Sequence, residues 1–281
     1  MINILPQLQN IDAICDGSSP NFTVCSADRK IENPEILASN NRIKSDQDGD
    51  SVNDYLYDSS GNNTKTAQGF SFTYDGENKQ IAARNASNTL IGEYYYEGGG
   101  NRVRKYVPDT GEVTIFVYDA VDRLISEYST NVSETPQVSY TTSDNLGTPR
   151  INTDQYGAVA ARHDYEPFGE EIDSSVSASR TEGLGYKPDD VRRKFTGYER
   201  DGETGLDYAQ ARYFSSALGR FTTPDHFAND TSNTDAQSWN LYAYVRNNPL
   251  MYTDPTGEDI ELKDGTSKED GGGSLPGAFD L

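Results

Sequence analysis

The sequence predicts a mostly β protein in which antiparallel β-hairpin repeats lie side by side in one sheet. The first observation is a tyrosine followed by an acidic residue, which recurs at Tyr57-Asp58, Tyr74-Asp75, Tyr96-Glu97 and Tyr118-Asp119. The last three copies are spaced by 22 residues, and the first lies 17 residues upstream of the second. The second observation is composition. The 19 Tyr, 25 Gly and 12 Pro in 281 residues, of which only 34% are apolar, favour short strands and turns over packed helices.

Each copy has the pattern of a strand, a turn and a second strand. Side chains alternate before the tyrosine, as in Phe70, Phe72 and Tyr74, and this period of two is typical of a strand. Three positions after each acid stands a residue that tolerates a positive φ, in order Gly61, Asn78, Gly100 and Asp122. A single hairpin is marginally stable in water, so such units are expected to stack into one sheet. Each tyrosine hydroxyl is expected in solvent or bonded to a turn carbonyl.

The remaining segments differ in character from the four copies. A further copy is expected at Tyr140, with Asp144 at the left-handed position. The predicted divisions are an irregular leader over 1–40, the repeat sheet over 41–172, a polar surface loop over 173–190, a dense block of motifs over 191–258, and a tail over 259–281. The tail is acidic and glycine-rich, which predicts disorder and no folded effector.

Charge and composition exclude several classes of partner. The net charge of -21 opposes binding to nucleic acid or to an anionic membrane. No apolar run resembles a membrane span, and the start Met1-Ile2-Asn3 lacks the basic residues of a signal peptide. The chain is therefore expected either to stay inside the cell or to be a piece of something larger. Cys15 and Cys25 stand ten residues apart and fit equally a disulfide that closes a small loop and two reduced thiols.

The dense block contains short motifs in a fixed order. They are Phe195-Thr196-Gly197, Glu199-Arg200-Asp201, Glu203-Thr204-Gly205-Leu206-Asp207-Tyr208, Ala211-Arg212-Tyr213, Leu218-Gly219-Arg220-Phe221, Pro224-Asp225, Asn240-Leu241-Tyr242-Ala243-Tyr244-Val245, Asn247-Asn248-Pro249 and Asp254-Pro255-Thr256-Gly257. As a series, these motifs resemble the repeat-associated core of the Rhs (YD-repeat) proteins. The upstream copies resemble that family's repeats, with Asp122 in place of the usual glycine, and the likeness spans about residues 41–257.

The resemblance implies a β-sheet wound into a spiralling shell, with a small α+β core that closes one end as a plug. In that family the shell encloses a variable C-terminal effector, often a toxin. This chain is too short to close a shell by itself, so it resembles either the last turns of one or a free-standing remnant. The resemblance also implies a C-terminal effector or upstream repeats as partners, and a secreted or cell-surface location.

Self-cleavage is the one enzymatic activity that the resemblance implies, and it relies on core aspartates. The family cuts one residue after Asp-Pro-x-Gly, but here Glu258 stands where the family has an apolar residue, usually leucine. A carboxylate holds its proton near neutral pH only if it is buried or beside another carboxylate. The candidate catalytic residues are Asp225 and Asp254, with Arg220 or Arg246 as the charge partner. The alternatives are a turn before proline for Asp254 and a helix or turn cap for Asp225.

A run of acidic residues before the first copy is a candidate calcium site. Its alternating spacing is that of the oxygen ligands at the start of an EF-hand loop, with the residues Asp46, Asp48, Asp50 and Asp54. Ser51 and Tyr57 occupy the positions of the loop glycine and the bidentate glutamate, so a solvated turn is the alternative. No other cofactor is expected.

Other chemistry has less support in the sequence. Neither His163 nor His226 has a serine or cysteine at a spacing that indicates a catalytic triad, so a hydrolase triad is unsupported. Trp239, Tyr242 and Tyr244 fit either a sugar site or the core of a β protein. The sequence therefore predicts an encapsulating module that is a candidate autoprotease. The alternatives are a secreted surface protein that binds glycans or partner cells, and a non-functional fragment of a larger gene.

Overall fold

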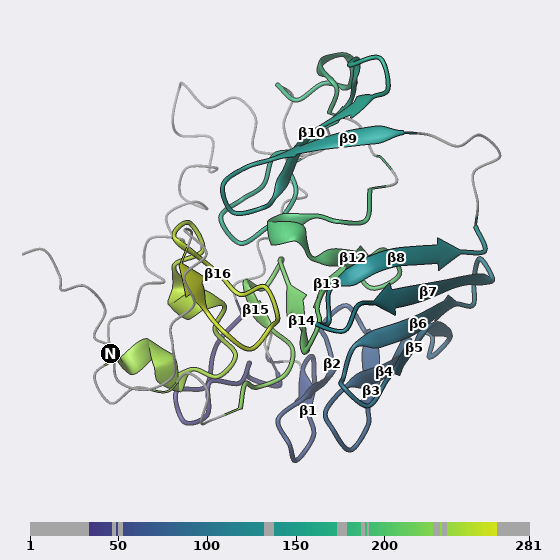
Figure 1. Ribbon diagram of the computed structural model, residues 1–281. Coiled ribbons are helices and arrows are strands. Elements are labelled where there is room, and N and C mark those ends of the chain that lie inside the picture. The colour runs from purple at the N-terminus through teal and green to yellow at the C-terminus, as the bar shows by residue number, and fades with distance from the viewer. Residues whose placement is uncertain are drawn as a thin grey trace, which may run out of the picture.

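Eight antiparallel strands follow one another in chain order and form one open sheet (Figure 1). The computed structural model describes residues 34–46, 49, 53–131, 138–172, 179–186, 189, 191–226, 231 and 235–262. This meander confirms the predicted row of hairpins. The strands are β1 (Leu56–Tyr57), β2 (Asn63–Lys65), β3 (Ser71–Tyr74), β4 (Gln80–Arg84), β5 (Leu90–Tyr96), β6 (Arg102–Val107), β7 (Glu112–Tyr118) and β8 (Leu124–Ser129).

One turn construction recurs in this sheet and beyond it. In the turn that begins at Asp75, the Asn78 amide donates to the Asp75 carbonyl at 3.2 Å, and the Asp75 amide donates to the Lys79 carbonyl at 3.0 Å. The Asp75 carboxylate accepts the amides of Glu77 and Lys79, both at 2.9 Å. Asn78 has a φ of 61°, in the left-handed region that asparagine tolerates. The same backbone pattern occurs in turns that begin at Asp58, Asn85, Glu97, Asp119, Asp144, Asp154 and Glu166.

The recurring tyrosine fastens each hairpin to the one before it. Tyr96 Oη donates to the Gln80 carbonyl at 2.8 Å, and Tyr118 Oη donates to the Arg102 carbonyl at 3.1 Å. Each acceptor lies six residues after the preceding tyrosine, just beyond its turn. Tyr74 Oη donates to the Asn63 carbonyl at 2.9 Å in the same way, six residues after Tyr57, although these two tyrosines are only 17 residues apart. The bond therefore depends on the acceptor's place just beyond the preceding turn and not on a fixed repeat length. The positive φ values predicted for these turns are confirmed at Gly61, Asn78, Gly100 and Asp122.

A second sheet follows the first and is separate from it. The strands β9 (Ser139–Ser143), β10 (Pro149–Asp154) and β11 (Val159–Arg162) form a three-stranded antiparallel sheet, so the sheet predicted for residues 41–172 is two sheets in the described residues. The prediction that Asp144 has a left-handed backbone conformation was wrong. Asp144 begins its turn, and Gly147 has the positive φ, of 85°. The acid here stands four residues after Tyr140 instead of one, which puts the turn out of register with the ring.

The dense block folds into a compact antiparallel sheet that packs on the repeat sheet. Its strands are β12 (Glu199–Asp201), β13 (Leu206–Ala209), β14 (Arg212–Ser215) and β15 (Arg220–Phe221), in that order. Phe72 and Tyr94 of the repeat sheet form one buried cluster with Tyr208 and Tyr213 of this core sheet. The burial of aromatic rings on both sides therefore places the core against the face of the hairpin row.

The helical part of the predicted plug consists of short 3-10 turns within the described residues. They are η3 (Phe195–Gly197), η4 (Ala236–Trp239) and η5 (Val245–Asn247), and a further turn, η2 (Glu182–Leu184), lies in the predicted polar loop. Two of these turns contain residues at positive φ, which are Thr196 and Gly197 in η3 and all three residues of η5, with Thr196 at 52° and Arg246 at 54°. A left-handed residue ends a right-handed helix after a single turn. In the part that the structure describes, these segments of the core therefore form short turns around the core sheet and no longer helix.

The structure describes the last residues of the predicted leader, 34–40, and the first residues of the predicted tail, 259–262. Within the leader and the start of the repeats, Ile36 pairs with Ile43 in an antiparallel bridge. At the other end, β17 (Glu261–Leu262) pairs with β16 (Tyr252–Thr253), so the chain after Glu258 stays on the core for at least four residues. Cys15, Cys25 and residues 263–281 lie outside the described residues.

Candidate functional site

Arg212 brings the two predicted catalytic aspartates together. Its Nη2 lies 2.8 Å from Asp225 Oδ2 and 3.2 Å from Asp254 Oδ2. Arg212 begins β14, Asp225 follows β15 and Asp254 follows β16, so three elements supply the site. The side chains of Arg212, Asp225 and Asp254 are 7%, 13% and 2% exposed, respectively. One guanidinium thus holds two carboxylates in a site that is nearly closed to solvent.

The Asp254-Pro255-Thr256-Gly257 segment is a tight turn fixed by the same residues. Asp254 Oδ1 accepts the Glu258 amide at 3.0 Å, and Arg212 Nε donates to the Gly257 carbonyl. Tyr198 Oη donates to the Asp254 carbonyl. Gly257 has a φ of 76°, and a Cβ there would collide with the Ala209 carbonyl, so the position requires glycine. The Asp254 carboxyl therefore lies beside the peptide group that precedes the expected cut.

Burial makes Asp254 a proton donor near neutral pH. Burial raises the pKa of Asp254 to about 7 and is the largest influence on it. Arg212 opposes this shift, and the charge of Asp225 adds to it. A carboxyl with a raised pKa at Asp254 beside a second carboxyl group at Asp225 is a combination suited to general acid–base hydrolysis.

The two charge partners predicted from the sequence differ in their surroundings, and Arg246 lines the same small cavity as Asp225. The Arg220 guanidinium carbon lies 4.8 Å from the centre of the Tyr242 ring, and Arg220 Nη2 donates to the Asn41 carbonyl. Arg246 Nη1 pairs with Asp235 Oδ2 at 3.0 Å. Arg212 is the arginine that contacts both aspartates, and a catalytic role for Arg220 or Arg246 stays a prediction. Sequence reasoning missed Arg212, although the motif Ala211-Arg212-Tyr213 was a signal for it.

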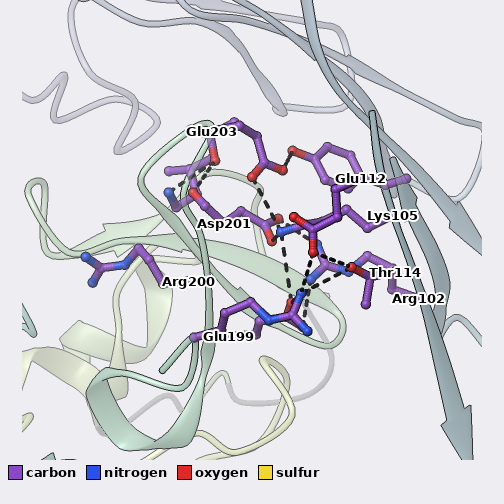
Figure 2. Close-up of polar contacts among 12 residues, drawn as sticks. Arg102, Lys105, Glu112, Thr114, Glu199, Arg200, Asp201 and Glu203 are labelled. Atoms are coloured by element: carbon purple, nitrogen blue, oxygen red, sulfur yellow. Dashed lines mark hydrogen bonds and ion pairs between the residues drawn. The ribbon is translucent and has the colours of Figure 1, made fainter. Parts of the chain in front are cut away.

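A buried cluster of charges joins the core to the repeat sheet (Figure 2). Arg102 of β6 lies 2.6 Å from Asp201 Oδ2 and 3.0 Å from Glu199 Oε2. Lys105 Nζ lies 2.7 Å from Asp201 Oδ1 and 3.4 Å from Glu203 Oε2. Figure 2 shows these side chains pointing toward one another across the contact between β6 and the core. Sequence reasoning singled out neither Arg102 nor Lys105.

The surroundings of Arg102 give this cluster a structural role. Its guanidinium carbon lies 4.1 Å from the centre of the Tyr208 ring and 5.1 Å from that of Phe116. Burial acts to lower the pKa of Arg102, but Asp201, Tyr213 and Glu199 together outweigh it and the pKa is raised. Burial acts to raise the pKa of Asp201, but Arg102 and Lys105 lower it. Both groups are therefore charged, and they fix the core on the repeat sheet.

The candidate calcium ligands are only partly described. Asp48 and Asp50 lie outside the described residues. Asp46 Oδ1 accepts the Gly49 amide at 2.7 Å, as in a turn. Among the described residues, no group of His, Cys, Asp and Glu is arranged to hold a metal ion. The calcium site stays a prediction.

The two histidines have different surroundings. His163 is buried, with Nδ1 2.6 Å from Glu171 Oε1 and Nε2 3.1 Å from Asp189 Oδ2. Burial acts to lower the pKa of His163, but Asp189 and Glu171 outweigh it, so the pKa is raised. The His163 ring ties the second sheet to the segment that precedes the core. His226 is exposed, and its amide donates to Asp225 Oδ1 at 2.6 Å.

The three aromatic residues considered for a sugar site are divided between core and surface. Tyr242 and Tyr244 are buried, and Tyr244 packs on Phe214 with ring centres 4.8 Å apart. Trp239 of η4 is 47% exposed. The two tyrosines therefore act as core residues, and a glycan partner stays a prediction.

Comparison with known proteins places this fold among repeat shells. The chain matches the family model described as Teneurin YD-shell over residues 36–250. It is 30% identical over 226 residues to the tRNA nuclease WapA of Bacillus subtilis (strain 168), which is 73% of this chain and 9% of WapA. It is 27% identical over 202 residues to teneurin-1 of Gallus gallus, which is 68% of this chain and 7% of teneurin-1. The crystal structure of TcdB2-TccC3-Cdc42 has a TM-score of 0.56 at 21% identity, covering 79% of this chain and 12% of that one.

The hairpin row, its bonded tyrosines and the docked core define a structural shell module. The chain belongs to the Teneurin YD-shell family, because that family's model matches well over half of its residues. The resemblance to YD-repeat proteins is thereby confirmed. The chain spans less than a tenth of the length of either WapA or teneurin-1. None of the helices in the described part of the chain is both long and apolar enough to cross a membrane.

Proposed function

We propose that this chain forms the end of a shell that encloses or presents a polypeptide segment. The outer strands β1 and β8 each pair on one side only within the described residues, so further repeats can extend the sheet. The buried pairs between Arg102 and the core support a plug that is held firmly in place. The proposed partners are upstream repeats and a C-terminal effector, and the proposed location is secreted or cell-surface.

The core of this module cuts its own chain after Glu258. A water molecule attacks the Glu258 carbonyl carbon while the Asp225 carboxylate accepts a proton from the water. Neutral Asp254 donates its proton to the amide nitrogen of Asp259, and the bond between that nitrogen and the Glu258 carbonyl carbon breaks. The products are a carboxylic acid at Glu258 and an amine at Asp259.

One observation carries this proposal: Arg212 contacts both Asp225 and Asp254 at the turn that precedes the cut. A small cavity next to Asp225 adds support. It measures about 20 Å³, and its lining includes Asp225, His226, Arg246 and Ile260. A cavity of this size holds one water molecule, and Ile260 lies two residues beyond the cut.

The test is the intact mass of freshly purified full-length chain followed over time. The expected products are residues 1–258 and a peptide of residues 259–281. Asp225→Asn and Asp254→Asn are each expected to slow the cut by about 100-fold or more, because each removes a proton-transfer group. The same spectra exclude acid hydrolysis of the Asp254-Pro255 bond, since that reaction yields a peptide that begins at Pro255.

Asp207→Asn is the matched control. Asp207 is also a fully buried carboxylate of the core, and it pairs with Arg200 at 2.5 Å, away from the proposed site. The control is expected to cut at the rate of the unaltered chain, with circular dichroism confirming that each variant is folded. A single full-length mass in the unaltered, folded chain overturns the proposal of self-cleavage.

A further inference from the structure

Lys79 extends from the repeat sheet toward the turn that carries the proposed cut. Its backbone is fixed, because its amide donates to Asp75 Oδ1 at 2.9 Å. Its side chain runs across the next turn at Gly100, where a Cβ would lie 3.0 Å from Lys79 Nζ and 3.1 Å from Cε. Glycine at position 100 therefore leaves room for Lys79 to reach the core.

The ammonium group of Lys79 reaches the core at Ala211, the residue whose amide bonds the turn that precedes Glu258. Lys79 Nζ donates to the Ala211 carbonyl at 3.4 Å, and the Ala211 amide donates to the Thr256 carbonyl at 2.9 Å. Glu258 follows two residues later, with its amide bonded to Asp254 Oδ1 at 3.0 Å and its side chain exposed. The exposed carboxylate is thus free to turn toward a lysine that is held next to its own turn.

Charge favours this pairing over the alternatives near Lys79. Burial lowers the pKa of Lys79, and Glu258 is the strongest opposing influence, ahead of Asp75 and Glu77 in the turn of Lys79 itself. A partly buried ammonium is stabilised by an adjacent carboxylate. Glu258 stands at the position where the family has an apolar residue. A pairing with Lys79 would give a physical reason for a glutamate at this position.

We infer that Lys79 is a specificity-determining residue, which receives the side chain of residue 258 and selects a peptide bond that follows an acidic residue. This substrate class rests on the self-cleavage proposed above. Because Lys79 belongs to the repeat sheet and Glu258 to the core, the selection works only when the two are docked.

The first test compares cutting rates by intact mass. Lys79→Met is expected to slow the cut after Glu258 by about tenfold or more, and Lys79→Arg is expected to keep it near the original rate. Combining Lys79→Met with Glu258→Leu restores cutting, because an apolar pair then replaces the ionic one. Lys65→Met is the control, since Lys65 Nζ donates to the Asn53 carbonyl, away from the site. Its rate is expected to match that of the unaltered chain.

The second test detects the pairing without requiring the cut. A water-soluble carbodiimide, which joins an ammonium to a carboxylate in contact, is applied to the Asp254→Asn chain, and the product is mapped by peptide mass. The expected product is an amide link between Lys79 and Glu258. If the unaltered chain stays whole but the link forms, the proposed self-cleavage fails and the pairing stands. If the chain cuts, Lys79→Met cuts equally fast and no link forms, the inference is overturned while self-cleavage stands.

Discussion

At the scale of single residues, the positive-φ positions show what a sequence can and cannot reveal. Asn62 Nδ2 donates to Asn78 Oδ1 at 2.8 Å, and Asn101 Nδ2 donates to Asp122 Oδ1 at 3.0 Å. The residue after one turn thus bonds the left-handed residue of the next, which explains why Asp122 replaces the family's glycine. The backbone conformation was predictable because it depends on local turn chemistry. The side-chain bonds were not, because they join residues that are 16 and 21 positions apart.

Asp254 gives a prediction about stability that is independent of cutting. Its pKa is about 7 in the folded chain against an ordinary value of 3.8, so between these values the folded carboxyl keeps a proton that the unfolded one has lost. Stability is therefore lost as pH rises from about 4 to 7. Asp254→Asn removes that loss and is expected to add on the order of 1–3 kcal/mol to the free energy of unfolding at pH 8, and little at pH 4. Urea denaturation at both pH values measures this, and a variant that is less stable than the parent at pH 8 contradicts it.

At the scale of elements, the contact between β6 and β12 depends on charges that sequence reasoning left out. The strand pattern around Arg102 and the motif Glu199-Arg200-Asp201 were both visible. Neither indicates that an arginine becomes fully buried against a distant carboxylate, because arginine is usually an exposed residue. The pairing follows from the docking of two sheets and requires their geometry.

Removal of either Arg102 or Asp201 is expected to lower the free energy of unfolding. Arg102→Met and Asp201→Asn each leave a buried charge without its main partner, so each is expected to lower the free energy of unfolding by about 3–5 kcal/mol. The double variant is expected to lose less than the sum of the two. Arg104→Met serves as the control, because Arg104 of β6 lies over the exposed ring of Tyr95. Strictly additive losses in urea denaturation argue against a coupled pair.

At the scale of the whole molecule, the order of repeats, linker and core was predictable, because repeat motifs lie in chain order. The break after β8 was not. Tyr140 has the same spacing as the earlier copies and was therefore predicted as a further one. Its turn begins at Asp144, four residues after the tyrosine, whereas in the earlier copies the turn begins at the next residue. Of the candidate site, the two aspartates were predicted from a resemblance. Their partner Arg212 was not, because it lies 42 residues from Asp254 in the chain and reaches it only through the fold.

The most direct test of this account is the pH dependence of self-cleavage in the full-length chain. The rate at which the peptide of residues 259–281 appears is measured by mass between pH 5 and pH 9. The account predicts a rate that does not depend on protein concentration and that falls about tenfold per pH unit above pH 7, as Asp254 loses its proton. A rate that stays level to pH 9, or one that grows with protein concentration, contradicts it.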